Sequence, residues 1–218
     1  MLPMRKTLIA FTAVALLSGP ALAQPAGLDG RIDALARSWD HVNYETKGPG
    51  KVDQLAAIAA QADALAKQYP GRAEPLIWKG IALSTEAGAK GGMGALGLAK
   101  EAKANLERAE KIDPNALNGS IYTSLGSLYY QVPGFPIGFG DKDKARAYLK
   151  KALAANPNGV DSNYFYADFL FHEGQYAEAE RALQKALAAP ARPGREVADK
   201  GRHAEAAALL AQVRAKRG

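Results

Sequence analysis

The chain has 218 residues, of which 28 are basic, 22 are acidic and none is cysteine, and its formal net charge is +6. Without cysteine it can form no disulfide and no thiolate metal site, and it has no cysteine nucleophile. The basic residues are interleaved with acidic ones, so no basic stripe marks a nucleic-acid partner.

Residues 1–23 have the pattern of a secretory signal peptide. Two basic residues precede an apolar run over 8–17, and the Ala-Leu-Ala of 21–23 has the A-x-A pattern of a cleavage site. The run is shorter than the roughly 20 residues that a membrane span needs. We therefore expect cleavage after Ala23, a mature protein in the periplasm and no stable insertion in the membrane.

Residues 28–70 have the composition of a first helical hairpin. Alanine is frequent and runs of β-branched residues are scarce, which favours helix. Helices are expected at 28–44 and 52–69, with the glycines and proline of TKGPG at 46–50 as the turn between them.

Three later segments, at 102–114, 145–157 and 179–190, repeat one pattern. Each has a small residue, a leucine four positions later, an alanine three positions further on, and a proline that ends the helix. The residues are Ala102, Leu106, Ala109 and Pro114; Ala145, Leu149, Ala152 and Pro157; and Ala179, Leu183, Ala186 and Pro190. Repeats of this kind predict stacked helical hairpins that share one core.

The helix expected before each of these segments carries the first half of a longer repeat pattern, of which the segments above are the second half. IYTSLGSLYY places Tyr122, Leu125, Gly126 and Tyr129 at the spacing W-x2-L-G-x2-Y, with tyrosine in place of tryptophan. Over about residues 74–190 the chain therefore resembles tetratricopeptide repeats.

The resemblance implies an all-α fold, a right-handed solenoid of about three to four helical hairpins with a C-terminal capping helix. We expect one domain over residues 24–218. The hairpins are expected at 28–70, 74–114, 118–157 and 160–190, and a closing helix at 199–216 is expected to cover the exposed end.

Two of the turns inside hairpins are longer than the repeat requires. QVPGFPIGFG at 131–140 carries seven extra residues, and EAGAKGGMGALG at 86–97 carries about eight. Equivalent turns of stacked hairpins project from the same edge, so the two segments are expected to form neighbouring lips. The lip at 131–140 is apolar, and its aromatic residues either pack on the next repeat or contact a ligand or partner.

The first helices of the last two hairpins are expected to line a concave groove, as they do in tetratricopeptide proteins. Rings, hydroxyls, one acid and one histidine on that face suit a peptide or a small amphiphilic ligand. With two phenylalanines of the lip, the candidate binding residues are Thr123, Ser127, Tyr130, Gln131, Phe135, Phe139, Tyr164, Asp168, Phe171 and His172.

Catalytic and metal-binding patterns are absent from the sequence. The three histidines lie on different expected helices, and no paired metal ligands, phosphate loop or nucleophile motif occurs. We therefore expect no catalytic residues, no metal, no cofactor and no enzymatic activity.

The signal peptide, WKGIALSTEAGAKGG, YTSLGSLYYQVPGFPIGFGD and NYFYADFL together resemble a narrower family. It is the periplasmic tetratricopeptide component associated with TRAP transporters, the TatT-like family. The resemblance implies docking to a periplasmic solute-binding protein, transfer of a hydrophobic ligand, and homo-oligomers.

Three functions follow as hypotheses. The favoured one is an adaptor that binds a protein partner, such as a solute-binding protein, through its groove and lips. The second is a carrier of a small hydrophobic ligand in the aromatic-lined groove, and the third is a factor in envelope assembly.

Overall fold

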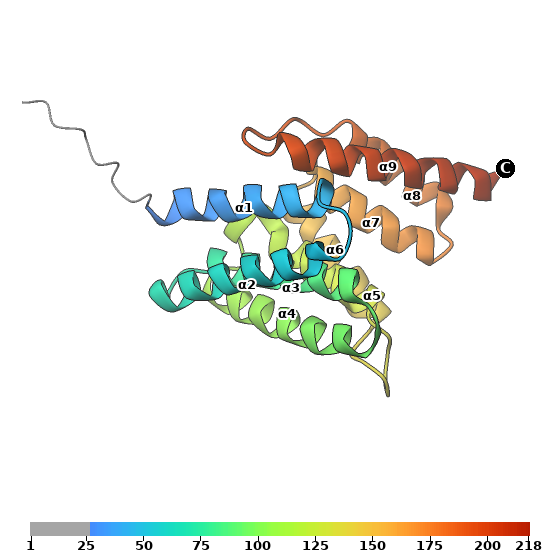
Figure 1. Cartoon of the computed structure of the whole chain (residues 1–218). Coiled ribbons are helices and arrows are strands. Elements are labelled where there is room, and N and C mark those ends of the chain that lie inside the picture. The colour runs from blue at the N-terminus through green and yellow to red at the C-terminus, as the bar shows by residue number, and fades with distance from the viewer. Residues whose placement is uncertain (1–26) are drawn as a thin grey trace, which may run out of the picture.

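The computed structural model describes residues 27–218, so the expected signal peptide lies outside the described residues. Over this range the chain forms nine α-helices and one short 3-10 helix, as the ribbon in Figure 1 shows. Their bounds are α1 Leu28–Tyr44, α2 Gly50–Gln68, α3 Glu74–Lys90, α4 Gly92–Ile112, η1 Ala116–Gly119, α5 Ser120–Gln131, α6 Lys142–Ala155, α7 Val160–His172, α8 Tyr176–Leu187 and α9 Glu196–Arg217. None of these helices combines the length and the apolar character that a membrane span needs.

Helices pack in consecutive pairs, because small residues let their axes approach. A Cβ at Gly126 of α5 would lie 2.6 Å from Cγ of Leu149 on α6. Leu149 is fully buried and fills the space that the missing side chain leaves. The repeated small residue and leucine therefore set the close contact of a hairpin, which confirms the expected all-α solenoid of helical hairpins.

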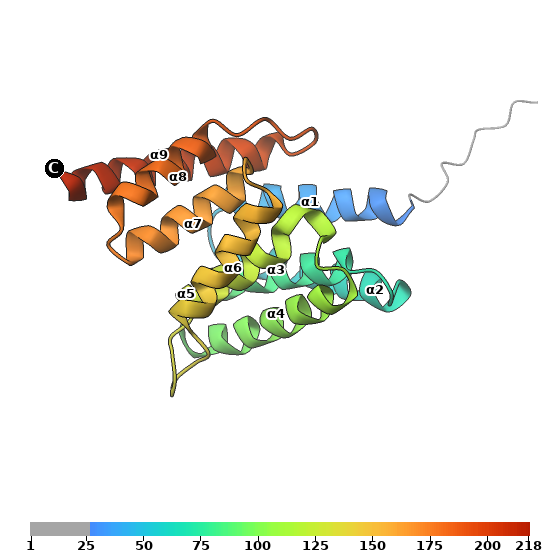
Figure 2. The same cartoon turned by 180° about the vertical axis from the view of Figure 1, so that it is seen from behind.

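The first helices of the hairpins form an inner ring. Contacts join α1 to α3, α3 to α5, α5 to α7 and α7 to α9, and α9 returns to contact α1. Figures 1 and 2 show α9 alongside both α1 and α7. The last helix thus does more than cover the exposed end, because it joins the end of the solenoid to its beginning.

A buried ion pair and a close approach hold the ring closed. Arg195, at the start of α9, donates from Nε and Nη2 to the two carboxylate oxygens of Asp40 on α1, at 2.6 and 2.7 Å. Asp40 is 2% exposed. On α9, Gly201 faces the ring of Tyr44, and a Cβ at this glycine would lie 2.1 Å from Cδ1 of that ring. Only a residue without a side chain allows this approach.

The turn between α3 and α4 differs from the expected lip. α3 continues to Lys90 and α4 begins at Gly92, so the extra residues of 86–97 lengthen two helices instead of forming a loop. Gly91 makes the sharp turn with a φ of 61°. Alanine-rich sequence favours helix, and two consecutive glycines with positive φ, Gly91 and Gly92, reverse the chain.

The 131–141 loop is an ordered projection beside this turn, and both views show it next to the start of α4 (Figures 1 and 2). Gly140 donates to the carbonyl of Pro133 at 2.9 Å, and Asp141 donates to the carbonyl of Tyr129 at 2.8 Å. The Asp141 side chain then caps α6 by accepting from the backbone of Asp143 and Lys144. The loop is therefore fixed at both ends.

Candidate functional site

The inner ring encloses a cavity of about 570 Å³, which is within the usual size range of small-molecule sites. Its walls come from α1, α3, α5, α7 and α9, together with the start of α2, the turn before α5 and the segment before α9. Because α1 and α9 meet, the concave face of the solenoid is bounded by a ring of helices.

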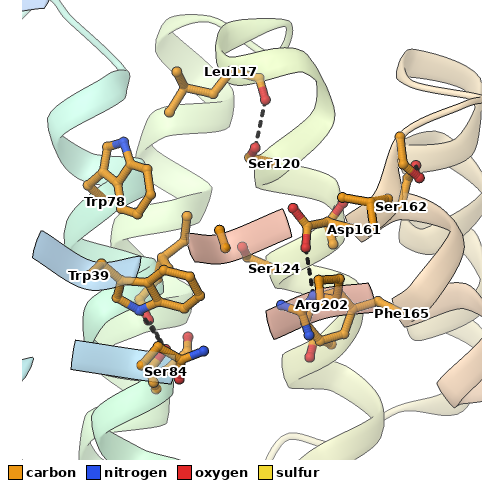
Figure 3. Close-up of a pocket in the computed structure, with 18 of the residues that line it drawn as sticks. Trp39, Trp78, Ser84, Leu117, Ser120, Ser124, Asp161, Ser162, Phe165 and Arg202 are labelled. Atoms are coloured by element: carbon orange, nitrogen blue, oxygen red, sulfur yellow. Dashed lines mark hydrogen bonds and ion pairs between the residues drawn. The ribbon is translucent and has the colours of Figure 1, made fainter. Parts of the chain in front are cut away.

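One wall is aromatic. The rings of Trp39 and Trp78 lie 6.1 Å apart, and Trp39 is held in place by a hydrogen bond from Nε1 to Thr85 at 3.0 Å. Figure 3 shows both tryptophans at one side of the cavity and Phe165 at the other. The two walls offer flat apolar surfaces to an occupant.

α5 supplies a polar wall between them, on which Figure 3 labels Ser120 and Ser124. The turn that leads into α5 also reaches the cavity, through Leu117 and Asn118. Both have left-handed backbone angles, with φ of 52° and 50°. This conformation is costly for a leucine, and strained backbone of this kind is found preferentially at functional sites.

A network of arginines and carboxylates forms the fourth wall. Arg192 donates from Nη1 to Asp161 at 2.7 Å and from Nε to Asp199 at 2.6 Å. Arg202 donates from Nε to Asp161 at 2.8 Å and from Nη1 to Glu205 at 2.5 Å. The network joins α7 to α9 and continues the connection that Arg195 makes to α1.

The paired arginines and carboxylates of this network keep each other charged. Burial alone would raise the pKa of Asp161, but the guanidinium groups of Arg202 and Arg192 outweigh it and lower that pKa. Burial alone would lower the pKa of Arg202, but the neighbouring carboxylate of Asp161 outweighs this effect and raises that pKa. Burial raises the pKa of Asp40, and Arg195 offsets part of that effect. Asp161 and Arg202 are therefore charged at neutral pH.

The candidate residues from the sequence fall into four places. Thr123, Ser127 and Gln131 line the cavity. Tyr164 does not line it; its ring lies under the guanidinium of Arg202, at 4.5 Å. Burial raises the pKa of Tyr164 to about 12, so its hydroxyl stays protonated at neutral pH.

Four more candidates form a separate cluster where α5 meets α7. Tyr130 donates to Asp168 at 2.5 Å, and Nδ1 of His172 lies 2.8 Å from the backbone oxygen of Asp168. Phe171 meets the His172 ring edge to face. Burial, together with Asp168, raises the pKa of Tyr130 well above its usual value. None of the four lines the cavity, so the α7 face that we expected to line the groove lies outside it.

The last two candidates have opposite environments in the 131–141 loop. Phe139 packs edge to face on Tyr129, with Nζ of Lys103 5.7 Å from the centre of its ring. Phe135 is 93% exposed and Ile137 is 69% exposed at the tip. Phe139 therefore anchors the loop, and the tip presents two apolar side chains to solvent.

Sequence reasoning missed the cavity residues at the two ends of the chain. Trp39 comes from the first hairpin, where the repeat pattern is degenerate. Trp78 comes from the second hairpin, whose first helix is longer than the repeat requires. Arg192 and Arg195 come from the segment before α9, which reads only as a break in the array, and Arg202 comes from the closing helix, which was expected only to cover the exposed end. The two arginines of ARPGRE were a usable signal, because arginine is the side chain best suited to pair bidentately with a carboxylate. Among residues 27–218 no group of three His, Asp or Glu side chains is placed to hold a metal ion.

Comparison with known proteins supports the fold. Residues 137–199 match the tetratricopeptide repeat family model. A thermophilic tetratricopeptide protein from Thermus thermophilus is 21% identical, covers 83% of this chain and 92% of its own, and superposes with a TM-score of 0.54. A MamA structure is 18% identical over 76% of this chain and 90% of its own, with a TM-score of 0.45. Comparison with curated proteins finds no match.

Proposed function

We propose that this chain, which has the tetratricopeptide-repeat fold, is a non-enzymatic adaptor that binds a protein partner through the tip of its 131–141 loop. The observation that carries the proposal is the exposure of Phe135 and Ile137, at 93% and 69%. Large apolar side chains at the end of a fixed projection are costly to keep in water unless a partner covers them. Repeat folds of this kind generally serve as scaffolds for protein partners.

Rigidity of the loop supports this role. Ile137 and Gly138 both donate to the carbonyl of Gly134, and the packed ring of Phe139 fixes the base. A preorganised loop loses little conformational entropy on binding, so more of the contact energy appears as affinity. The pair Phe135 and Ile137 therefore has the properties of an interface hot spot.

The experiment compares wild-type protein with the Phe135→Ser, Ile137→Ser variant as immobilised bait in periplasmic extract. Proteins that only wild type retains are identified by mass spectrometry and purified, and their affinity is measured. Hot-spot residues cost about 1 to 4 kcal/mol each, so the variant is expected to bind at least tenfold more weakly.

The matched control is Ile112→Ser. Ile112 is also an exposed large apolar residue, at 39%, but it lies at the end of α4 and not in the loop. The control variant is expected to bind as wild type does. Equal binding by the loop variant and wild type would refute the proposal.

The partner and the location are parts of the same proposal. Resemblance to the periplasmic component of TRAP transporters favours a solute-binding protein as the partner, and the signal pattern of residues 1–23 favours the periplasm. A purified solute-binding protein whose affinity depends on Phe135 would support both.

A second function rests on the cavity. About 570 Å³ of space between tryptophan and phenylalanine rings suits a carrier of a small molecule. This role is compatible with the adaptor, because the loop tip and the cavity are formed by different residues.

A further inference from the structure

The charged residues that line the cavity are mostly basic. Four of them carry positive charge and one, Asp161, carries negative charge. The basic residues are Lys51, Arg192, Arg195 and Arg202. The other carboxylates that pair with the arginines, Asp40, Asp199 and Glu205, do not line the cavity. The charged groups on the cavity wall are therefore mostly cationic, and three of the four carboxylates that pair with the arginines do not line the cavity.

Several of these donors have unused capacity. Nζ of Lys51 donates to the backbone oxygen of Asn43 at 2.6 Å, and among residues 27–218 no carboxylate lies within salt-bridge distance of it. An ammonium group has three N–H donors, so two remain. Nη2 of Arg192 and Nε1 of Trp78 are buried and lack a hydrogen-bond partner in the described part of the chain. Buried donors without acceptors are rare in native proteins.

Apolar surface lies beside these donors. Trp39 and Trp78 form one wall, Phe165 forms the other, and the guanidinium of Arg195 lies 5.3 Å from the centre of the Trp78 ring. A ligand that fits both features has a flat apolar body and an anionic group at one end.

We infer that the cavity binds an amphiphilic organic anion, whose acidic group contacts Lys51 and the arginines and whose apolar body lies between Trp39, Trp78 and Phe165. This inference rests on the carrier function of the cavity and does not depend on the loop tip. It narrows the small amphiphilic ligand expected from the sequence to an anion, because the closing segment adds basic residues to the wall.

The test uses two fluorescent probes of the same shape, anilinonaphthalene sulfonate and its neutral parent anilinonaphthalene, titrated into the full mature chain. Wild type is expected to bind the sulfonate at one site and about tenfold more tightly than the neutral probe, since charge-assisted hydrogen bonds are the stronger class. The Lys51→Gln variant is expected to lose about tenfold in sulfonate affinity and to keep its affinity for the neutral probe.

Lys47→Gln and Phe135→Ser are the controls. Lys47 is exposed, lies in the turn next to α2 and does not line the cavity, and Phe135 is at the distant loop tip. Both variants are expected to keep both affinities. Equal or tighter binding of the neutral probe, or an unchanged sulfonate affinity in Lys51→Gln, would overturn the anion assignment alone. Failure of both probes to bind would overturn the carrier function as well.

Discussion

Replacing Arg195 with methionine is expected to lower the free energy of unfolding by about 3 kcal/mol, because it leaves the buried carboxylate of Asp40 without its partner. Asp40 is 2% exposed, and Arg195 supplies both of its short side-chain contacts. For a chain of this size the loss corresponds to a fall in melting temperature of about 6 to 12 °C. Urea unfolding at neutral pH, followed by circular dichroism, measures the change.

The pH dependence of this loss has a definite sign. Burial already raises the pKa of Asp40, and removing Arg195 raises it further. A buried acid with a raised pKa favours the folded state at low pH, and that advantage disappears as the pH rises through the folded-state pKa. The difference between variant and wild type is therefore expected to grow from pH 4 to pH 7.

Arg214→Met is the matched control. It removes an arginine from the same helix, but its partner Glu180 forms an exposed surface pair with it. Such pairs contribute little, so this variant is expected to unfold like wild type. A double variant, Asp40→Leu with Arg195→Met, is expected to recover most of the loss, because it buries no unpaired charge. If Arg195→Met is as stable as Arg214→Met, the ion pair does not hold the ring.

Phe169→Ala is expected to be the other strongly destabilising change, at about 3 to 5 kcal/mol. Phe169 of α7 is fully buried, meets the ring of Tyr130 edge to face and lies 4.8 Å from the guanidinium of Arg146. Truncation leaves a cavity between α5, α6 and α7. Urea unfolding again measures the loss.

Phe135→Ala is its control, because it removes the same atoms from a ring that is 93% exposed. A change within about 0.5 kcal/mol is expected there. A large loss for Phe135→Ala would mean that the loop tip serves packing and not recognition, and it would count against the proposed adaptor.

Contacts between the two helices of a hairpin were predictable from the sequence. The pattern that joins Gly126 to Leu149 appears in the chain as a small residue and a leucine at fixed spacing, and the structure places them in contact. Such contacts are local and periodic, so a repeat read from one sequence specifies the solenoid.

Closure of the ring could not be read in the same way. Asp40 and Arg195 are 155 residues apart, and neither belongs to the repeat pattern. Their contact depends on the curvature summed over all hairpins, which no single motif encodes. The cavity walls that depend on this closure, and the positive charge they carry, were therefore missed.

The loop shows a similar limit at the scale of single residues. Composition marks 131–140 as an apolar insertion, but Phe135 and Phe139 look alike in the sequence. Their environments differ because only Phe139 reaches the ring of Tyr129. The structure thus separates the anchor of the loop from its exposed tip.

A single disulfide tests the closed ring, on which the cavity and its ligand depend. A Cβ at Gly201 would lie 2.5 Å from Cγ of Tyr44. The Cβ atoms of the two residues are therefore at most about 4 Å apart, within the range of a disulfide. Because the chain has no cysteine of its own, the pair Tyr44→Cys, Gly201→Cys has no competing thiol.

Mild oxidation of the folded monomer, followed by thiol titration, is the measurement. The closed ring predicts that this pair forms the disulfide completely. The control pair Tyr44→Cys, Lys216→Cys, with its second site about 22 Å further along α9, is expected to keep both thiols free. Two free thiols in the Tyr44→Cys, Gly201→Cys protein would contradict the closed ring.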